Sequence, residues 1–129
     1  APQDHAAFYA SSRLTLNVTR RAMAEMGWCP SGRLFEAAAC GTAILSDWWP
    51  GLDEFFEPGS EILIARSAND VFEALDRDNG EIRHIADAAR ERVLADHTSF
   101  RRAAEFEAFL NEARSPANSA PAPLLTQRG

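Results

Sequence analysis

The sequence predicts an α/β fold in which a partial parallel sheet of about three strands is flanked by helices. Short apolar runs at 14–18, 43–46 and 62–65 have the length and composition of strands. Segments with helical character separate these runs, and such alternation is typical of a parallel sheet. A self-contained doubly wound domain usually has about five or six strands, so we expect this sheet to be half of a larger one.

The beginning of the chain predicts a helix, a strand and a loop. A short helix carrying Phe8 and Tyr9 is expected over 4–11, and the strand at 14–18 follows it after a very short connection. Residues 19–26 are expected to be a loop with some helix, closed by a glycine.

A helix and a buried strand are predicted next. Ser31 is a good N-cap and Pro30 fixes the chain just before it, so we expect a helix over 32–40. Gly41 supplies the stop for this helix, and the strand at 43–46 follows.

The start of this helix is a candidate binding site. The first N–H groups of a helix have no partners within the helix, and Gly32 places no bulky side chain at its first position. A helix N-terminus that opens onto a cleft can hold a phosphate, because its N–H groups and its dipole both favour negative charge.

Two adjacent tryptophans follow the second strand, in a turn-rich loop at 47–51. Trp48 and Trp49 could stack on a nucleobase or a sugar. They could also plug the space under the loop, or contact another domain, and we favour the plug or contact interpretation.

The remaining elements follow turn and capping signals. Ser67 and Asp70 have the spacing of a capping box. The expected elements are a helical turn at 52–56, a strand at 62–65, and helices at 67–77, 82–93 and from Thr98 or Ser99 to about residue 110. Residues 115–129 are rich in Ser, Pro, Ala and Asn and are expected to be a flexible tail. We therefore predict one domain over 1–114 and a tail over 115–129.

Composition excludes several classes of function. The net charge of −6 argues against a nucleic-acid-binding protein, which needs a basic stripe. The 129 residues contain no lysine, so lysine chemistry such as a Schiff base is excluded within the chain. No apolar run is long enough to span a membrane, and there is no secretory signal pattern. The two cysteines and three histidines lack metal-ligand spacing, so we expect no metal and a reduced, cytoplasmic protein.

Four stretches of the chain resemble the C-terminal domain of group 1 glycosyltransferases, and in particular the branch described as spore maturation protein CgeB. They lie at 9–12, 14–18, 34–42 and 51–54. The Glu-Ala-Ala-Ala-Cys-Gly run that begins at Glu36 is fairly specific, and the resemblance covers roughly residues 5–105.

This resemblance implies half of a GT-B fold, in which two Rossmann-like domains face each other across a cleft. The C-terminal domain of such a bacterial enzyme binds a nucleoside-diphosphate sugar as donor substrate, and no other cofactor is implied. The family's donor-site glutamate falls on Glu36, which is expected to accept hydrogen bonds from the ribose hydroxyls. The residues expected to bind the donor are Glu36, Ser31, Gly32, Arg33, Arg20, Gly51 and Glu54.

The chain also departs from the family pattern. Many group 1 enzymes have two glutamates with seven residues between them, the second of which falls on Glu36, and Trp28 occupies the first position here. The basic pair that usually binds the diphosphate, and the N-terminal acceptor domain, would precede Ala1. We therefore expect a donor-binding portion that is inactive alone, and no catalytic residue is assigned.

Other interpretations of the same residues stay open. Glu36 could form only a solvent-exposed pair with Arg33, three residues earlier, and Arg20 could belong to a solvated loop. The alternative function is a non-catalytic α/β interaction module that kept the fold and lost the site. Because one edge of a half sheet, expected at 14–18, would be unpaired and apolar, we also expect a cover such as a second copy in a homodimer.

Overall fold

The computed structural model describes residues 4–114, which form two compact units. The first unit ends at His97 and contains the sheet; the second begins at Thr98 and contains helix α6 (Ser99–Arg114). The expectation of a single domain over 1–114 stays a prediction, and the expected tail lies outside the described residues.

Three parallel strands form an open sheet in the order β1-β2-β3. They are β1 (Leu14–Asn17), β2 (Ala43–Ser46) and β3 (Leu63–Ile64). Leu14 lies opposite Ala43, and Leu45 lies opposite Leu63. The predicted fold class is confirmed, with β1 and β3 shorter at their ends than the predicted 14–18 and 62–65.

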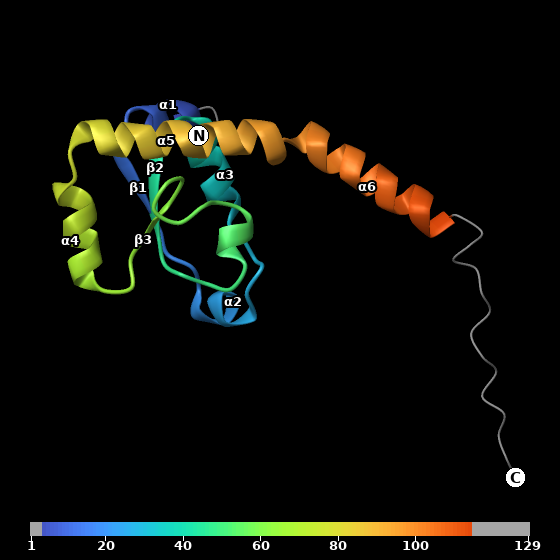
Figure 1. Ribbon diagram of the computed structural model, residues 1–129, viewed down its shortest axis with the longest axis horizontal. Helices are drawn as coiled ribbons and strands as arrows, with labels where there is room; N and C mark the ends of the chain where they lie inside the picture. The colour runs from blue at the N-terminus through green and yellow to red at the C-terminus, as the bar shows by residue number, and fades with distance from the viewer. Residues whose placement is uncertain (1–3, 115–129) are drawn as a thin grey trace, which may run out of the picture. The chain divides into compact units, whose positions relative to one another are not determined.

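Helices cover both faces and both ends of this sheet. They are α1 (His5–Ala10), α2 (Arg21–Met26), α3 (Gly32–Ala39), α4 (Ala68–Asp76) and α5 (Asn79–Asp96), with a short 3-10 helix, η2 (Leu52–Glu54). Helices α3 and α4 lie on opposite sides of the strands, and α5 crosses their amino ends (Figure 1). Helix α2 lies beyond their carboxyl ends, so the segment predicted as a loop with some helix contains a regular helix of six residues.

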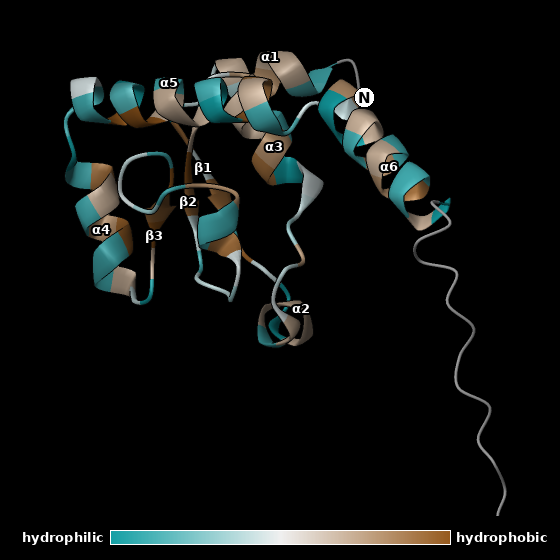
Figure 2. Ribbon diagram, turned by 45° about the vertical axis from the view of Figure 1, so that its right-hand side comes forward, coloured by the Kyte–Doolittle hydropathy of each residue, from teal (hydrophilic) through white to brown (hydrophobic). Residues whose placement is uncertain are grey.

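The alternation of side chains along β2 separates two apolar clusters. Ile44 belongs to the first cluster, while Ala43 and Leu45 belong to the second, as expected for successive residues of a strand. In Figure 2 much of β2 and β3 has the brown colour of hydrophobic residues, while the surrounding helices carry many teal, hydrophilic residues. A strand buried on both faces in this way is typical of a parallel sheet.

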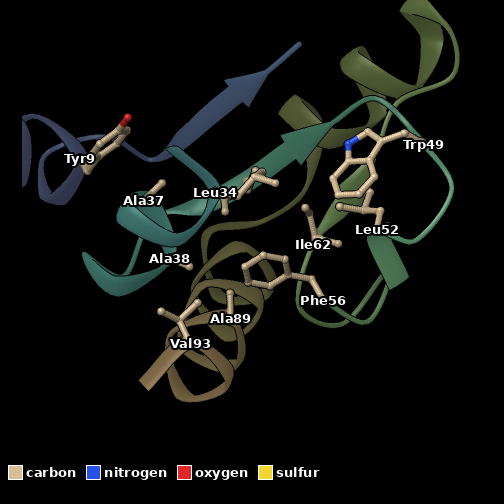
Figure 3. Packing of buried hydrophobic residues seen from close by; sticks show 11 residues of the cluster. Tyr9, Leu34, Ala37, Ala38, Trp49, Leu52, Phe56, Ile62, Ala89 and Val93 are labelled. Carbon is tan, nitrogen blue, oxygen red and sulfur yellow. The ribbon is translucent and has the colours of Figure 1, made fainter. Parts of the chain in front are cut away.

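The first cluster joins α3 to the loop after β2. Figure 3 shows Leu34 of α3 beside Trp49, Leu52, Phe56 and Ile62. Trp49 is 1% exposed, so the plug interpretation is confirmed for this residue. Burial of these large side chains fixes the position of the loop that follows β2.

Helix α4 begins with the predicted capping box. The Ser67 hydroxyl accepts a hydrogen bond from the Asp70 amide, and the Asp70 carboxylate accepts one from the Ser67 amide. Hydrogen bonds from the backbone amides of Arg66 and Ser67 lower the pKa of Asp70 below its ordinary value.

An ion-pair network links α5 to the loop before β3. The Arg92 guanidinium donates to Glu61 at 3.1 Å and to Asp96 at 3.3 Å. The hydrogen bond to Glu61, followed by that to Asp96, raises the pKa of Arg92.

Strand β1 pairs on only one side within the described part of the chain. Leu16, on this strand, is 55% exposed, and Val18, just after it, is 67% exposed. The expected unpaired apolar edge is therefore present.

No helix of the described residues is long and apolar enough to cross a membrane.

Candidate functional site

The start of α3 has the predicted geometry and is open to solvent. Ser31 is the N-cap, and its hydroxyl accepts a hydrogen bond from the Arg33 amide at 3.3 Å. The Leu34 amide donates to the Ser31 carbonyl at 3.0 Å. A Cβ built on Gly32 would meet no atom within 4 Å, so the first turn of the helix has space in front of it. Two of its first amides are thus already paired, and the open position is that of Gly32.

A hollow of about 210 Å³ lies beside this helix start. It is bounded by the carboxyl end of β1, by α2 and by the loop that enters α3. Its lining residues are Asn17, Val18, Thr19, Arg20, Met23, Cys29, Ser31 and Arg33. Ligands of open α/β sheets bind outside the carboxyl ends of the strands, which is where this hollow is found.

The lining contains two arginines and no acidic residue. Arg20 is the N-cap residue of α2 and Arg33 lies in the first turn of α3, and both side chains are exposed. Guanidinium groups can donate two parallel hydrogen bonds to a phosphate. The hollow therefore has the residue types of a phosphate site: two cations, the Ser31 hydroxyl and a helix N-terminus.

Asn17 places a polar atom under the hollow. Its side chain is 1% exposed, and its Nδ2 donates to Ser46 Oγ at 3.0 Å. Its Oδ1 is buried and has no hydrogen-bond partner in the described residues. Buried polar atoms are nearly always paired, so this oxygen, like the buried Trp49 Nε1, is an exception among the described residues.

The loop between β1 and α2 is fixed from the neighbouring strand. Asp47, just after β2, accepts hydrogen bonds from the Thr19 amide at 2.9 Å and the Thr19 hydroxyl at 3.0 Å. These two bonds hold the residue immediately before Arg20, so they define where the Arg20 side chain begins.

Glu36 does not line this hollow. It lies one turn after Arg33 on the same helix, and its side chain is exposed. The expected ribose contact of Glu36 stays a prediction, and the structure places this residue further along α3 than the phosphate-like part of the site.

Gly51 and Glu54 also lie apart from the hollow, in a second cluster with Trp28. The Trp28 indole Nε1 donates to Glu54 Oε1 at 3.0 Å, and the Trp28 amide donates to the Pro50 carbonyl at 2.8 Å. A Cβ on Gly51 would lie 2.5 Å from Cδ1 and Nε1 of Trp28, so only glycine lets the ring approach this closely.

The structure thus brings Arg20, Ser31 and Arg33 together, and it groups Gly51 with Glu54. Asn17, Thr19 and the pairing of Trp28 with Glu54 were not among the predicted site residues. Asn17 and Thr19 sit at the end of a predicted strand, which is a usable signal for a ligand contact. The pairing of Trp28 with Glu54 spans 26 residues and has no sequence signal.

Trp48, the first of the two tryptophans after β2, differs from its neighbour Trp49. Trp48 is 38% exposed, and the Arg66 guanidinium lies 5.9 Å from the centre of its ring. Its contact is with an arginine, at a typical cation–π distance.

Within residues 4–114, no group of three or more His, Cys, Asp or Glu side chains could hold a metal ion.

Comparisons with known proteins identify the family of the chain and its fold. A family model described as glycosyl transferase-like matches residues 1–108. Among solved structures, sucrose-phosphate synthase from Thermosynechococcus elongatus is similar, with a TM-score of 0.66 and 21% sequence identity. The match covers 81% of this chain and 26% of that protein, so the chain spans about a quarter of its length. No curated protein sequence matches the chain.

Proposed function

The chain belongs to the glycosyl transferase-like family, and on that premise we propose that it is the donor-binding part of a glycosyltransferase that uses a nucleoside-diphosphate sugar. The observation that carries this proposal is the hollow at the end of β1, where the start of α3 meets Arg20 and Arg33. This combination suits a diphosphate, which needs positive charge and N–H donors.

Each part of the hollow has a role in the proposed reaction. Transfer of the glycosyl group breaks its bond to the diphosphate, so negative charge grows on the departing phosphate. Arg33 and the N-terminus of α3 stabilise that charge, and Arg20 faces the same hollow from the other side. Ser31 supplies a hydroxyl group, whose oxygen accepts from the Arg33 amide and whose proton can go to the ligand.

Glu36 has a separate place in this proposal. Its exposed carboxylate lies one turn beyond Arg33, on the part of α3 that follows the diphosphate. A ribose attached to that diphosphate could reach Glu36 along the helix. The family resemblance supports this role, and the acceptor would then be bound by a partner domain that precedes this part of the protein.

Calorimetric titration of the 129-residue chain with UDP and GDP tests the proposal. Wild-type protein should bind one of the two, and Arg33→Gln should weaken that binding by about tenfold, because one charge-assisted contact is lost. Arg21→Gln is the matched control, since Arg21 is exposed, pairs with Glu25 and does not line the hollow. Absence of binding by both nucleotides, or an equal loss in the control, would contradict the proposal.

A non-catalytic interaction module is the second candidate, favoured by one observation. The edge strand β1 carries exposed Leu16, and Val18 beside it is exposed as well, a pattern that suits contact with another chain or domain. Sedimentation of the chain distinguishes the two: a stable homodimer that Leu16→Arg dissociates, without nucleotide binding, supports the module.

A further inference from the structure

A second groove lies on the β3 side of the sheet, whereas the hollow at the start of α3 lies on the β1 side. Its volume is about 480 Å³, and it shares no lining residue with that hollow. It is bounded by β3, by the loop after β2 and by both ends of α4, which lies beside β3 in Figures 1 and 2. A groove of this size is in the range of small-molecule sites.

One wall of this groove is the indole of Trp48. The two tryptophans after β2 differ in burial, since Trp49 is 1% exposed in the core and Trp48 is 38% exposed. An aromatic ring that is partly exposed in a groove can pack on the C–H face of a pyranose, because both surfaces are apolar. Trp48 therefore supplies a platform on which a sugar ring can lie.

Two guanidinium groups add positive charge to the same groove. The Arg66 guanidinium lies over the Trp48 ring, 5.9 Å from its centre, and Arg77 lines the groove as well. Both residues are exposed, and neither belongs to an ion pair among residues 4–114. A guanidinium can donate two parallel hydrogen bonds to a carboxylate or a phosphate. The groove thus presents an aromatic ring next to a cation that has no anionic partner.

The one acidic residue of the lining does not cancel this charge. Asp70 Oδ2 accepts hydrogen bonds from the backbone amides of Arg66 at 2.6 Å and Ser67 at 2.8 Å, so this carboxylate is held at the start of α4. With two arginines and one aspartate, the lining keeps a net positive charge. The whole chain has a net charge of −6, so the groove is opposite in sign to the rest of the protein.

We infer that this groove is a second carbohydrate site, which binds a sugar that carries a carboxylate or a phosphate group. The sugar ring packs on Trp48, and the Arg66 guanidinium donates hydrogen bonds to the anionic group. This site is separate from the proposed donor site and does not depend on it. Because β1 and β3 are two strand spacings apart, about 10 Å, the hollow and the groove can be occupied at the same time.

Two-dimensional NMR of the tryptophan side chains tests this inference. The chain contains three tryptophans, so three indole N–H signals are expected, and Trp48→Phe identifies the signal of Trp48. The 129-residue chain is titrated separately with glucuronate, glucose 6-phosphate, glucose and inorganic phosphate. The first two distinguish a carboxylate from a phosphate, while glucose and inorganic phosphate each offer only one half of the ligand.

At least one anionic sugar should shift the Trp48 signal in a saturable way and leave those of Trp28 and Trp49 in place. It should bind about tenfold more tightly than glucose or inorganic phosphate, because it alone meets both the ring and the cation. Arg66→Gln should remove the advantage over glucose. Trp48→Ala, followed through the backbone amide of Arg66, should weaken binding about threefold to tenfold.

Arg83→Gln is the matched control, since it removes the same charge from an exposed arginine that does not line the groove. Its affinity for the anionic sugar should equal that of the wild type. An equal loss in Arg83→Gln and Arg66→Gln would show a general effect of charge and overturn the inference.

Other results would overturn it as well. No shift of the Trp48 signal at millimolar sugar would exclude the site, and inorganic phosphate that binds as tightly as the anionic sugar would show an adventitious ion only. Displacement of the bound sugar by UDP or GDP would place the sugar in the hollow at the start of α3. Because the sugar titration contains no nucleotide, its failure is distinct from a failure of the proposed function.

Discussion

Replacing Gly51 with alanine tests how tightly Trp28 is held. An added Cβ would lie 2.5 Å from Cδ1 and Nε1 of the indole, whereas ordinary carbon contacts are at about 3.5–4.0 Å. The ring must therefore recede by about 1 Å, which breaks its hydrogen bond to Glu54 at a cost of about 1 kcal/mol. Gly51 also has a φ of +90°, and any residue with a Cβ is destabilised there by about 1 kcal/mol.

Gly59→Ala is the matched control for this change. Gly59 has the same φ of +90°, yet a Cβ built there meets nothing within 4 Å. Gly59→Ala should lower the free energy of unfolding by the backbone contribution alone, about 1 kcal/mol. Gly51→Ala should lower it by about 2–3 kcal/mol. The difference corresponds to a fall in Tm of roughly 4–15 °C beyond that of the control.

Thermal unfolding followed by circular dichroism measures both variants. Adding Trp28→Gly to Gly51→Ala should restore about 1 kcal/mol, because the contacting ring is gone and the coupling between neighbours disappears. Equal losses of stability for Gly51→Ala and Gly59→Ala would refute the close packing of Trp28 on Gly51. The absence of energetic coupling between residues 28 and 51 would refute it as well.

Two further predictions concern stability. Asp70→Asn should lower Tm at pH 7, because hydrogen bonds from backbone amides lower the pKa of the Asp70 carboxyl in the folded state. The stabilisation by this carboxylate is present above the unfolded pKa of about 3.9 and is lost as the pH falls through the folded pKa. Melting curves from pH 7 to pH 2.5 should show the variant approaching the wild type below about pH 4, and a difference independent of pH would contradict this. Leu34→Ala should lower the free energy of unfolding by about 2–5 kcal/mol in urea, because Leu34 is 0% exposed. Leu94→Ala, at a residue that is 51% exposed, should cost less than about 1 kcal/mol, and similar losses for the two would show that α3 is not packed as described.

Local signals in the sequence predicted the sheet and the start of α3. Ser31 and the pair Ser67 and Asp70 act through neighbours within four residues, so their spacing was sufficient to place two helix starts. The continuous apolar run of β2 likewise indicated a strand buried on both faces. Each of these features depends on residues close together in the chain.

Contacts between distant segments could not be predicted in the same way. Arg13 donates to Asn79 Oδ1 at 2.7 Å across 66 residues, and Trp28 meets Glu54 across 26. Neither pair follows a helical or strand period, and both depend on how loops meet after the sheet has formed. For this reason the sequence suggested a single site that combines Gly51 and Glu54 with the start of α3. In the structure, Gly51 and Glu54 do not line the hollow at the start of α3.

The position of Glu36 illustrates the same difference. Its spacing from Arg33 was compatible with a ligand contact and with an exposed ion pair. The structure leaves its side chain exposed and outside the lining of the hollow, and no ion pair joins it to Arg33 among the described contacts. Spacing along one helix is the same for both roles, so the sequence pattern alone did not separate them.

The central claim is that the start of α3 and the end of β1 bind the diphosphate of a nucleotide sugar. Two-dimensional NMR of the 129-residue chain, titrated with UDP and with GDP, tests this most directly. The account predicts that the Gly32 amide and the amides of Thr19, Arg20 and Arg33 shift first, while the amides of α5, which does not line this hollow, do not change. Shifts confined to other regions, or none at millimolar nucleotide, would contradict it.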